Sequence, residues 1–398
     1  MNPYRMAAPP RRWDSKLSPL VVRLMRPFGV RKRKSNQQLM NIHVKHAEII
    51  RDAISAGNGV MIVSNHPTHA DAFSMNEAAV LAGTCFHYLA TWHVFDAVGK
   101  IGQWLLQRHG VFSIDREGTD RIAFKQAVNL LQEDKHPLVI FPEGEVYHCN
   151  DRVTPFREGA SAIAFTAAKR AKRPIVCIPC GMKYRYLEDP TPELLSVMDQ
   201  IEQSIHWRPR RHQSLPQRIL ECAGALMGLK ELEFLGEVRS GSLPERTDFL
   251  AQEILTRLES RHEAKTGVGT IPERVKELRR RTLELMQEAG TPTDEQQQQW
   301  NDDLDDLFLA VQLFSYPGDY VAENPTIERL AETMDKLEED VLGVYSATVR
   351  SAREATVTFG EPIAIDPGKR SREAISDLTR TMEEHVQQLV NDGGIQPD

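Results

Sequence analysis

Short apolar runs alternate with longer segments in which apolar residues recur every three or four positions. Runs at residues 59–63, 111–114 and 138–141 have the length and composition of buried strands. The segments around them have the spacing of amphipathic helices, at 72–81, 95–107, 119–132 and 158–172. This alternation over residues 51–190 predicts an α/β fold in which a largely parallel sheet is flanked by helices.

The pattern changes after residue 190. Residues 191–350 hold charged amphipathic segments, which predict a helical insertion, and we identify no internal repeat in them. The clearest predicted helices of this region are 244–262, 272–287 and 325–342. Residues 351–398 then read as a strand at 356–365 and a C-terminal helix at 371–390, which should return to the sheet and complete the core.

Positive charge is concentrated at the N-terminus. Residues 1–50 hold eleven Lys or Arg against two acidic residues, a net charge of +9 in a chain whose overall charge is −7. A basic, amphipathic N-terminal helical segment is typical of a helix lying on an anionic membrane, although the same apolar stripe could instead dock on the core. No nucleic-acid-binding motif accompanies the charge. The stripe consists of Leu17, Val21, Leu24 and Phe28, with Pro27 expected to limit the helix and Arg31–Lys34 as the densest basic cluster.

Composition narrows the environment further. The sequence has no apolar run long enough to cross a membrane and no apolar signal segment, which predicts a cytoplasmic protein, peripheral on the inner face of the membrane. Its five cysteines sit in or beside apolar segments and are expected to be reduced and buried. Cys177 and Cys180 have the spacing of a metal or redox pair, but no second ligand pair accompanies them. We therefore expect no metal and no cofactor.

Polar residues follow each of the three predicted strands. His66 and Asp71 come after the first strand, Asp115 and Arg116 after the second, and Glu143 after the third. The carboxyl ends of parallel strands share one edge of a sheet, so these residues should converge. A histidine oriented by a carboxylate can act as a general base on an alcohol. The sequence has no Gly-x-Ser-x-Gly nucleophile, which favours direct transfer over an acyl-enzyme.

Four blocks resemble the glycerolipid acyltransferase family, of the PlsC or 1-acylglycerol-3-phosphate acyltransferase type. Asn65–Asp71 looks like the family's Asn-His-x-x-x-x-Asp block, and Phe141–Gly144 matches its Phe-Pro-Glu-Gly block. Gly110–Arg116 and Pro174–Pro179 resemble the other two. Val357–Ile363 is similar to the strand that often closes such domains.

This resemblance implies roles for particular residues. His66 and Asp71 would be catalytic, and Asn65, Arg116, Glu143 and Gly144 would contact substrate. The donor would be acyl-CoA or acyl-acyl-carrier protein. The acceptor would be a lysophospholipid, with 1-acylglycerol-3-phosphate first and glycerol-3-phosphate or another lysolipid or alcohol as alternatives.

The third block departs from the family. Glu145 and Val146 follow Gly144, where relatives commonly have threonine and then an arginine that is read as a phosphate partner. Phosphate would then be held by Arg116 with a second cation, or the acceptor carries a different headgroup or none. The candidates for that cation are Lys125, Arg152 and Arg157.

Two functions of other classes remain open on the sequence. His66, His69 and Asp71 could be ligands of a metal-dependent hydrolase. Alternatively, the chain could be a non-catalytic lipid-binding scaffold. This interpretation stays open because Val146 stands where relatives commonly have an arginine. Acyl-chain length, the choice between CoA and carrier protein, the role of the insertion and the oligomeric state are not set by the sequence.

Overall fold

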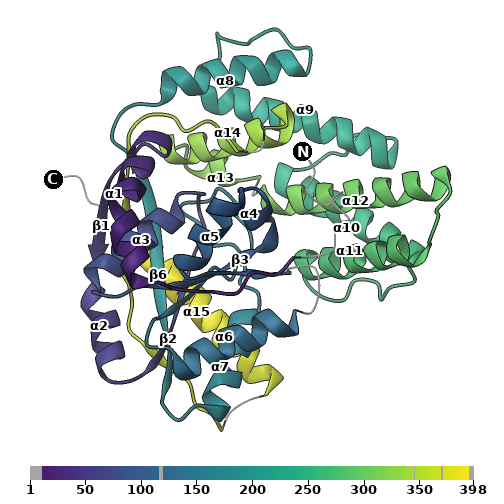
Figure 1. The fold of residues 1–398 in the computed structure, drawn as a ribbon. Coiled ribbons are helices and arrows are strands. Elements are labelled where there is room, and N and C mark those ends of the chain that lie inside the picture. The colour runs from purple at the N-terminus through teal and green to yellow at the C-terminus, as the bar shows by residue number, and fades with distance from the viewer. Residues whose placement is uncertain (1–10, 116–119, 317, 345, 369–370, 394–398) are drawn as a thin grey trace. The chain divides into compact units, whose positions relative to one another are not determined.

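The structure is a computed structural model that describes residues 11–115, 120–316, 318–344, 346–368 and 371–393. It divides into two compact units. Thr191–Thr348 belong to the first, here called the helical unit, and the other described residues form the second, called the sheet unit. Figure 1 traces both units along the chain.

The sheet unit is built on one eight-stranded sheet in the order β1-β7-β6-β2-β5-β3-β4, with β8 beside β6. Neighbouring strands are parallel except where β7 and β8 run antiparallel to β6. The predicted α/β class with a largely parallel sheet is therefore confirmed. The strands are β1 (Leu39–Lys45), β2 (Gly59–Ser64), β3 (His87–Thr91), β4 (Val111–Ile114), β5 (Leu138–Ile140), β6 (Ile175–Tyr186), β7 (Arg353–Phe359) and β8 (Ile363–Ala364).

Helices cover both faces of this sheet, so β2 is buried on both sides. Its alternate residues enter two cores: Val60 and Ile62 one, Met61 and Val63 the other. Gly59 is required because a Cβ there would lie 2.0 Å from the carbonyl oxygen of Leu131. The helices of the sheet unit are α1 (Pro19–Asn36), α2 (Ala47–Ser55), α3 (Asp71–Leu81), α4 (Trp92–Asp96), α5 (Lys100–Arg108), α6 (Arg121–Glu133), α7 (Gly159–Arg170) and α15 (Arg372–Asp392).

Three predicted elements differ in the structure. The single helix expected at 95–107 is two helices, because the chain turns at Gly99, the N-cap of α5. The strand expected at 356–365 is likewise two strands, β7 and β8, which pair with different parts of β6. Pro27 does not limit α1 but lies inside it, on an exposed face where water can bond the carbonyl group that proline leaves unpaired.

The N-terminal segment also contributes a strand to the sheet. Residues 39–45, within the basic segment of the sequence analysis, form β1 and pair in parallel with β7. Only alternate side chains of this strand are well covered, and several are polar, which is why no apolar run marks it.

The cysteines are free thiols, four of them buried and Cys85 partly covered. Cys177 and Cys180 belong to different cores, on opposite faces of β6, because residues an odd number apart on a strand point in opposite directions. This pair therefore does not form a metal site. Burial raises the pKa of both thiols to about 12.

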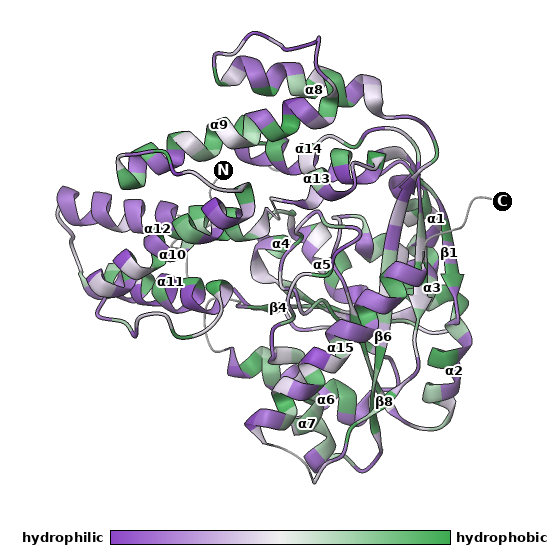
Figure 2. Cartoon of the chain, turned by 180° about the vertical axis from the view of Figure 1, so that it is seen from behind, coloured by the Kyte–Doolittle hydropathy of each residue, from purple (hydrophilic) through white to green (hydrophobic). Residues whose placement is uncertain are grey.

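The helical unit has a core of its own, drawn mainly from its four longest helices. Hydrophobic and hydrophilic residues are interspersed along these helices (Figure 2). None of the described helices of the chain has the length and apolar content needed to span a bilayer. The helices of this unit are α8 (Thr191–Ser204), α9 (Leu215–Leu235), α10 (Leu243–Arg261), α11 (Ile271–Glu288), α12 (Asp294–Ser315), α13 (Tyr320–Glu323) and α14 (Ile327–Leu342).

The expectation that the insertion lacks an internal repeat is wrong. A motif of Ser or Thr, Leu or Ile, Pro, Gln or Glu, and Arg begins at residues 214, 242 and 270, 28 residues apart, and starts three successive helices. Its arginine pairs each time with a buried glutamate of the preceding helix, at 2.6 to 2.7 Å. Each glutamate also accepts a hydrogen bond from the backbone eight residues further on. The pairs are Arg218–Glu202, Arg246–Glu231 and Arg274–Glu259.

Candidate active site

His66 and Asp71 form a hydrogen-bonded pair just beyond the carboxyl end of β2. Nδ1 of His66 lies 2.6 Å from Oδ2 of Asp71, the first residue of α3. Because a carboxylate accepts hydrogen bonds, Nδ1 carries the proton and Nε2 holds the lone pair. Nε2 has no hydrogen-bond partner among the described residues, and the side chain remains 24% exposed. The imidazole can therefore accept a proton from a bound alcohol.

The two residues are held in place from several sides. The His66 ring stacks on Phe141, with centroids 4.3 Å apart and planes inclined by 18°. Asp71 is fully buried, and its Oδ2 also accepts a hydrogen bond from the Thr68 amide. Its position in the first turn of α3 places the carboxylate at the positive end of the helix dipole.

The second oxygen of Asp71 is bound by Tyr184. The Tyr184 hydroxyl donates to Oδ1 at 2.7 Å and also lies 2.8 Å from the Ser74 hydroxyl. Burial, and then the negative charge of Asp71, raise the pKa of Tyr184 well above its ordinary value, so the hydroxyl stays a donor. Asp71 thus binds His66 and the Thr68 amide through Oδ2, while Tyr184 fixes Oδ1.

Two asparagines fix the part of β6 that carries Tyr184. The Asn65 side chain exchanges two 2.8 Å hydrogen bonds with the backbone of Met182. The Asn150 side chain does the same with the backbone of Tyr184, at 2.7 and 2.6 Å. β2 pairs with β6 only as far as Cys180. Beyond that residue, the two asparagine side chains make the backbone hydrogen bonds that a neighbouring strand would otherwise make. A direct contact of Asn65 with substrate stays a prediction.

Glu143 joins two loops beneath the histidine. Its Oε1 accepts a hydrogen bond from the His66 amide at 2.7 Å, and its Oε2 accepts one from the Thr154 amide at 3.2 Å. Burial raises the pKa of this carboxyl to about 8, although the hydrogen bonds from the two amides act in the opposite direction. In the structure Glu143 therefore holds the His66 backbone, and its predicted contact with an acceptor hydroxyl is not tested.

Gly144 makes a tight turn after β5. It has φ of +86°, and a Cβ there would lie 2.7 Å from Cζ of Arg157, so a side chain would displace that guanidinium. The turn thus brings a cation against the backbone that follows Glu143.

Other predicted residues lie elsewhere. Arg116 falls outside the described residues, although Asp115 is described and donates its amide to Asp120, the N-cap of α6. Among the described residues, His66, His69 and Asp71 do not cluster as a set of metal ligands, and the His69 ring meets that of His148, with centroids 5.6 Å apart. The structure thus brings together His66, Asp71, Glu143 and Gly144, whereas the side chain of Asn65, next to His66 in the chain, bonds the backbone of β6.

A comparison with known families covers this same part of the chain. Residues 41–183 match the model of the acyltransferase family. This segment is therefore similar to acyltransferase domains. No curated protein matches the chain.

The matched segment runs from β1 into β6 and contains the whole His66 loop, and the match supports acyl transfer as its chemistry. Sequence reasoning missed two residues that position the pair, Phe141 and Tyr184. Tyr184 lies one residue beyond the matched segment. The sequence indicates Tyr184 only through an alternating pattern, in which Cys180, Met182 and Tyr184 all enter one core. This pattern marks a strand that continues beyond the sequence block ending at Pro179.

Proposed function

We propose that this protein transfers a fatty acyl group from a thioester to the free hydroxyl of a lysophospholipid, with 1-acylglycerol-3-phosphate as the first acceptor. The observation that carries the proposal is the His66–Asp71 pair with Nε2 unoccupied among the described residues. The match to the acyltransferase family supports the reaction class. The resemblance of Asn65–Asp71 to the lysophosphatidate branch supports the acceptor, and glycerol-3-phosphate is the closest alternative.

The residues support a direct mechanism. Nε2 of His66 takes the proton of the acceptor hydroxyl while its oxygen attacks the thioester carbonyl carbon. Asp71 keeps the ring in the required tautomer and stabilises the imidazolium. The carbon–sulfur bond then breaks, the new ester forms, and the thiolate recovers the proton from Nε2. No covalent enzyme intermediate is needed.

We assign recognition of the acceptor phosphate to Arg116 together with Arg157. Val146 stands where the family commonly has an arginine, so a cation must come from elsewhere. The Arg157 guanidinium packs against Gly144, and its Nε is buried without a hydrogen-bond partner among the described residues. Its planar fork suits a phosphomonoester.

An acceptor panel tests this assignment. With a labelled acyl thioester and products read by mass spectrometry, Arg157→Ala should raise the KM for 1-acylglycerol-3-phosphate about 10-fold or more, the effect of losing one charge-assisted contact. The KM for a neutral lysolipid should stay the same. Arg170→Ala, at the end of α7, is the matched control. Equal use of neutral and phosphorylated acceptors by the wild type would refute phosphate recognition but not acyl transfer.

We also propose that α1 docks the enzyme on an anionic membrane, on the inner face in the cytoplasm. The stripe expected from the sequence changes in the structure, because Leu17 and Val21 are partly covered, whereas Leu20, Leu24 and Phe28 are 66%, 64% and 66% exposed. These three lie on one helical face, and the basic cluster follows them. Such a face suits the boundary of a bilayer that carries negative charge.

Sedimentation with phosphatidylglycerol-containing vesicles tests the docking face. Leu24→Ser with Phe28→Ser should lower the partition coefficient at least about 10-fold, since each exposed side chain would otherwise bury apolar area worth about 1.5 to 3 kcal/mol. Binding should also weaken with salt. Leu229→Ser with Leu232→Ser, on exposed positions of α9, is the control. Equal loss in both double variants would remove α1 as the anchor.

A further inference from the structure

Helix α5 exposes large apolar side chains that the proposed mechanism does not use. None of its nine residues is buried, although four of them are Ile, Trp or Leu. Ile101 is 78% exposed and Trp104 is 47% exposed. They are three residues apart and therefore lie on one side of the helix. Large apolar side chains grouped on a surface mark a contact with a partner or a membrane.

The N-terminal segment ties α5 to the start of α1. The Lys16 amide donates a hydrogen bond to the carbonyl group of Gln107 at 3.0 Å. The Ser18 amide donates one to the carbonyl group of Arg108 at 2.9 Å. Both carbonyl groups lie in the last turn of α5, where a helix has no partners of its own for them. α1 begins directly after Ser18 and packs against α5 and α3 (Figure 1), so the exposed residues of α1 and α5 lie on neighbouring helices.

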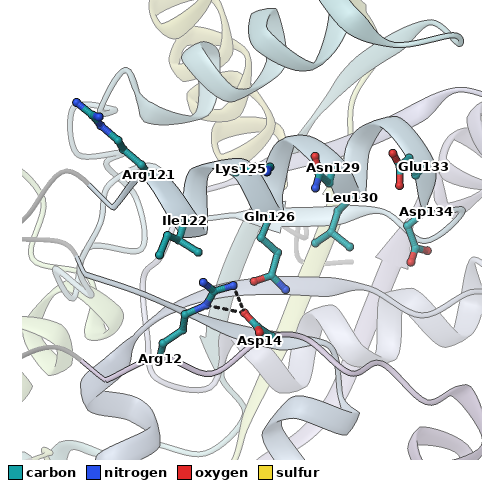
Figure 3. Close-up of a pocket in the computed structure, with 10 residues that line it drawn as sticks. All are labelled: Arg12, Asp14, Arg121, Ile122, Lys125, Gln126, Asn129, Leu130, Glu133 and Asp134. Atoms are coloured by element: carbon teal, nitrogen blue, oxygen red, sulfur yellow. Dashed lines mark hydrogen bonds and ion pairs between the residues drawn. The ribbon is translucent and has the colours of Figure 1, made fainter.

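Both segments are basic and contain no acidic residue. Residues 15–47 have eight Lys or Arg, residues 97–113 have two, and neither range has Asp or Glu. Arg12, just before the first range, is already neutralised by Asp14, with Nη2 2.6 Å from Oδ1 (Figure 3). The two helices therefore present positive charge that attracts an anionic surface.

The cations border the apolar side chains. The Arg108 guanidinium lies over the Trp104 ring, with Cζ 5.6 Å from the ring centroid. Tryptophan is enriched where a membrane meets water, because its ring is apolar and its N–H is polar. Exposed Trp, Ile, Leu and Phe beside Lys and Arg thus match the boundary of an anionic bilayer.

The same layer of helices reaches the active site. Met75 of α3, Phe95 of α4 and Leu106 of α5 contribute to one core on one face of the sheet. α3 begins at Asp71. α4 follows the carboxyl end of β3, which runs parallel to β5 and, through it, to β2. A bilayer on α1 and α5 therefore lies against helices that start at the edge of the sheet where His66 is found.

We propose that Ile101 and Trp104 of α5 insert into an anionic bilayer together with α1. A protein held by one helix could still turn about the axis of that helix, whereas two inserted helices fix how the sheet unit lies on the membrane. The acceptor lysolipid then reaches His66 from the bilayer. This inference rests on the proposed function, because it adds a second contact to the membrane on which α1 is proposed to dock.

Quenching of tryptophan fluorescence by brominated lipids tests the insertion directly. Vesicles of phosphatidylglycerol and phosphatidylcholine with brominated acyl chains should quench the wild type, because Trp104 is the most exposed of the five tryptophans. Trp104→Phe should still bind these vesicles but lose most of the quenching. A wild type that sediments with the vesicles without being quenched, or equal quenching of Trp104→Phe, would overturn the insertion and leave docking by α1 standing. The other tryptophans are buried or partly covered: Trp13, Trp92, Trp207 and Trp300.

Vesicle partitioning of the full chain measures the strength of the contact. Ile101→Gln with Trp104→Gln should lower the partition coefficient about 10-fold or more, since two inserted side chains are lost while glutamine preserves the helix. The matched control, Leu229→Gln with Leu232→Gln, changes two exposed residues at the same spacing on α9 and should bind as the wild type does. Equal binding by the α5 variant and the wild type would overturn the inference, and so would a wild type that binds no vesicles. A wild-type dimer that the α5 variant loses, in place of quenching, would assign this face to a second copy of the chain.

Kinetics separate a failure of this inference from a failure of the proposed function. The α5 variant should show a KM about 10-fold higher for a lysolipid held in vesicles, with kcat/KM unchanged for a short-chain lysolipid dissolved as monomers. A wild-type KM in vesicles for this variant would overturn the inference while leaving acyl transfer intact. Quenching of Trp104 without transfer to any lysolipid would instead refute the proposed function and leave the membrane contact of α5 standing.

Discussion

Replacing His66 with alanine should lower kcat/KM for acyl transfer by about 10²- to 10⁴-fold, the usual contribution of a general base. The ring supplies the only lone pair placed for the proton in our mechanism, and no other described group bonds to Nε2. The fold should survive, because the side chain is partly exposed and lies in a loop. Steady-state assays with a labelled thioester, and melting curves of the same samples, measure both effects.

His69→Ala is the matched control for this substitution. It removes the same side chain three residues further along the loop, where the ring is exposed and faces His148 instead of Asp71. Its kcat/KM should stay close to the wild type. Near-normal turnover by His66→Ala, or an equal loss in both variants, would remove His66 as the base.

Changing Asp71 to asparagine should lower kcat by about 10³- to 10⁴-fold while the structure stays nearly the same, as in other histidine–aspartate pairs. An amide nitrogen facing Nδ1 would make that atom an acceptor and move the proton to Nε2. Nε2 would then have no lone pair for the alcohol. The measurement is kcat, together with the imidazole tautomer by nitrogen NMR of labelled protein.

Tyr184→Phe separates this tautomer effect from loss of a hydrogen bond. It removes the donor to Oδ1 of Asp71 and leaves the bond to His66 intact. A net hydrogen bond is worth about 1 kcal/mol, so the loss in kcat should be only about 5- to 10-fold. If Asp71→Asn loses no more than Tyr184→Phe, the carboxylate merely supports the loop and does not set the tautomer.

The strands and helices that could be predicted are those whose buried residues form a recognisable hydrophobic pattern in the sequence. β2 and β4 are apolar along nearly their whole length, and the α/β class followed from them. β1 and β3 were missed because several of their side chains are polar or partly exposed. The repeat in the helical unit was missed because its signal is a five-residue turn motif every 28 residues, not a hydrophobic period.

The candidate site was predictable where strand ends converge. The parallel sheet places the loops that follow its strands at one edge. In the structure these loops bring four of the predicted residues close to one another: His66, Asp71, Glu143 and Gly144. What the sequence could not supply were partners brought from β6. Tyr184 is 113 residues from Asp71, and nothing in its neighbours indicates which carboxylate its hydroxyl reaches. The sequence likewise does not indicate that the backbone amides of His66 and Thr154 donate hydrogen bonds to the Glu143 carboxylate.

The pairing of β6 with β7 has a consequence for how this protein can be modified. Tyr186 stands opposite Arg353, and the Leu187 amide bonds the carbonyl group of Ala352 at 2.8 Å, so the chain leaves the sheet and re-enters it at adjacent points. Topologically, β6 and β7 are the arms of a hairpin whose turn has been replaced by Thr191–Thr348. A hairpin tolerates such an insertion, because closing a longer loop adds little entropic cost. Replacing the insertion with a short turn should therefore also leave the sheet folded. Modules of quite different size and partner preference could therefore be exchanged at this one junction during evolution.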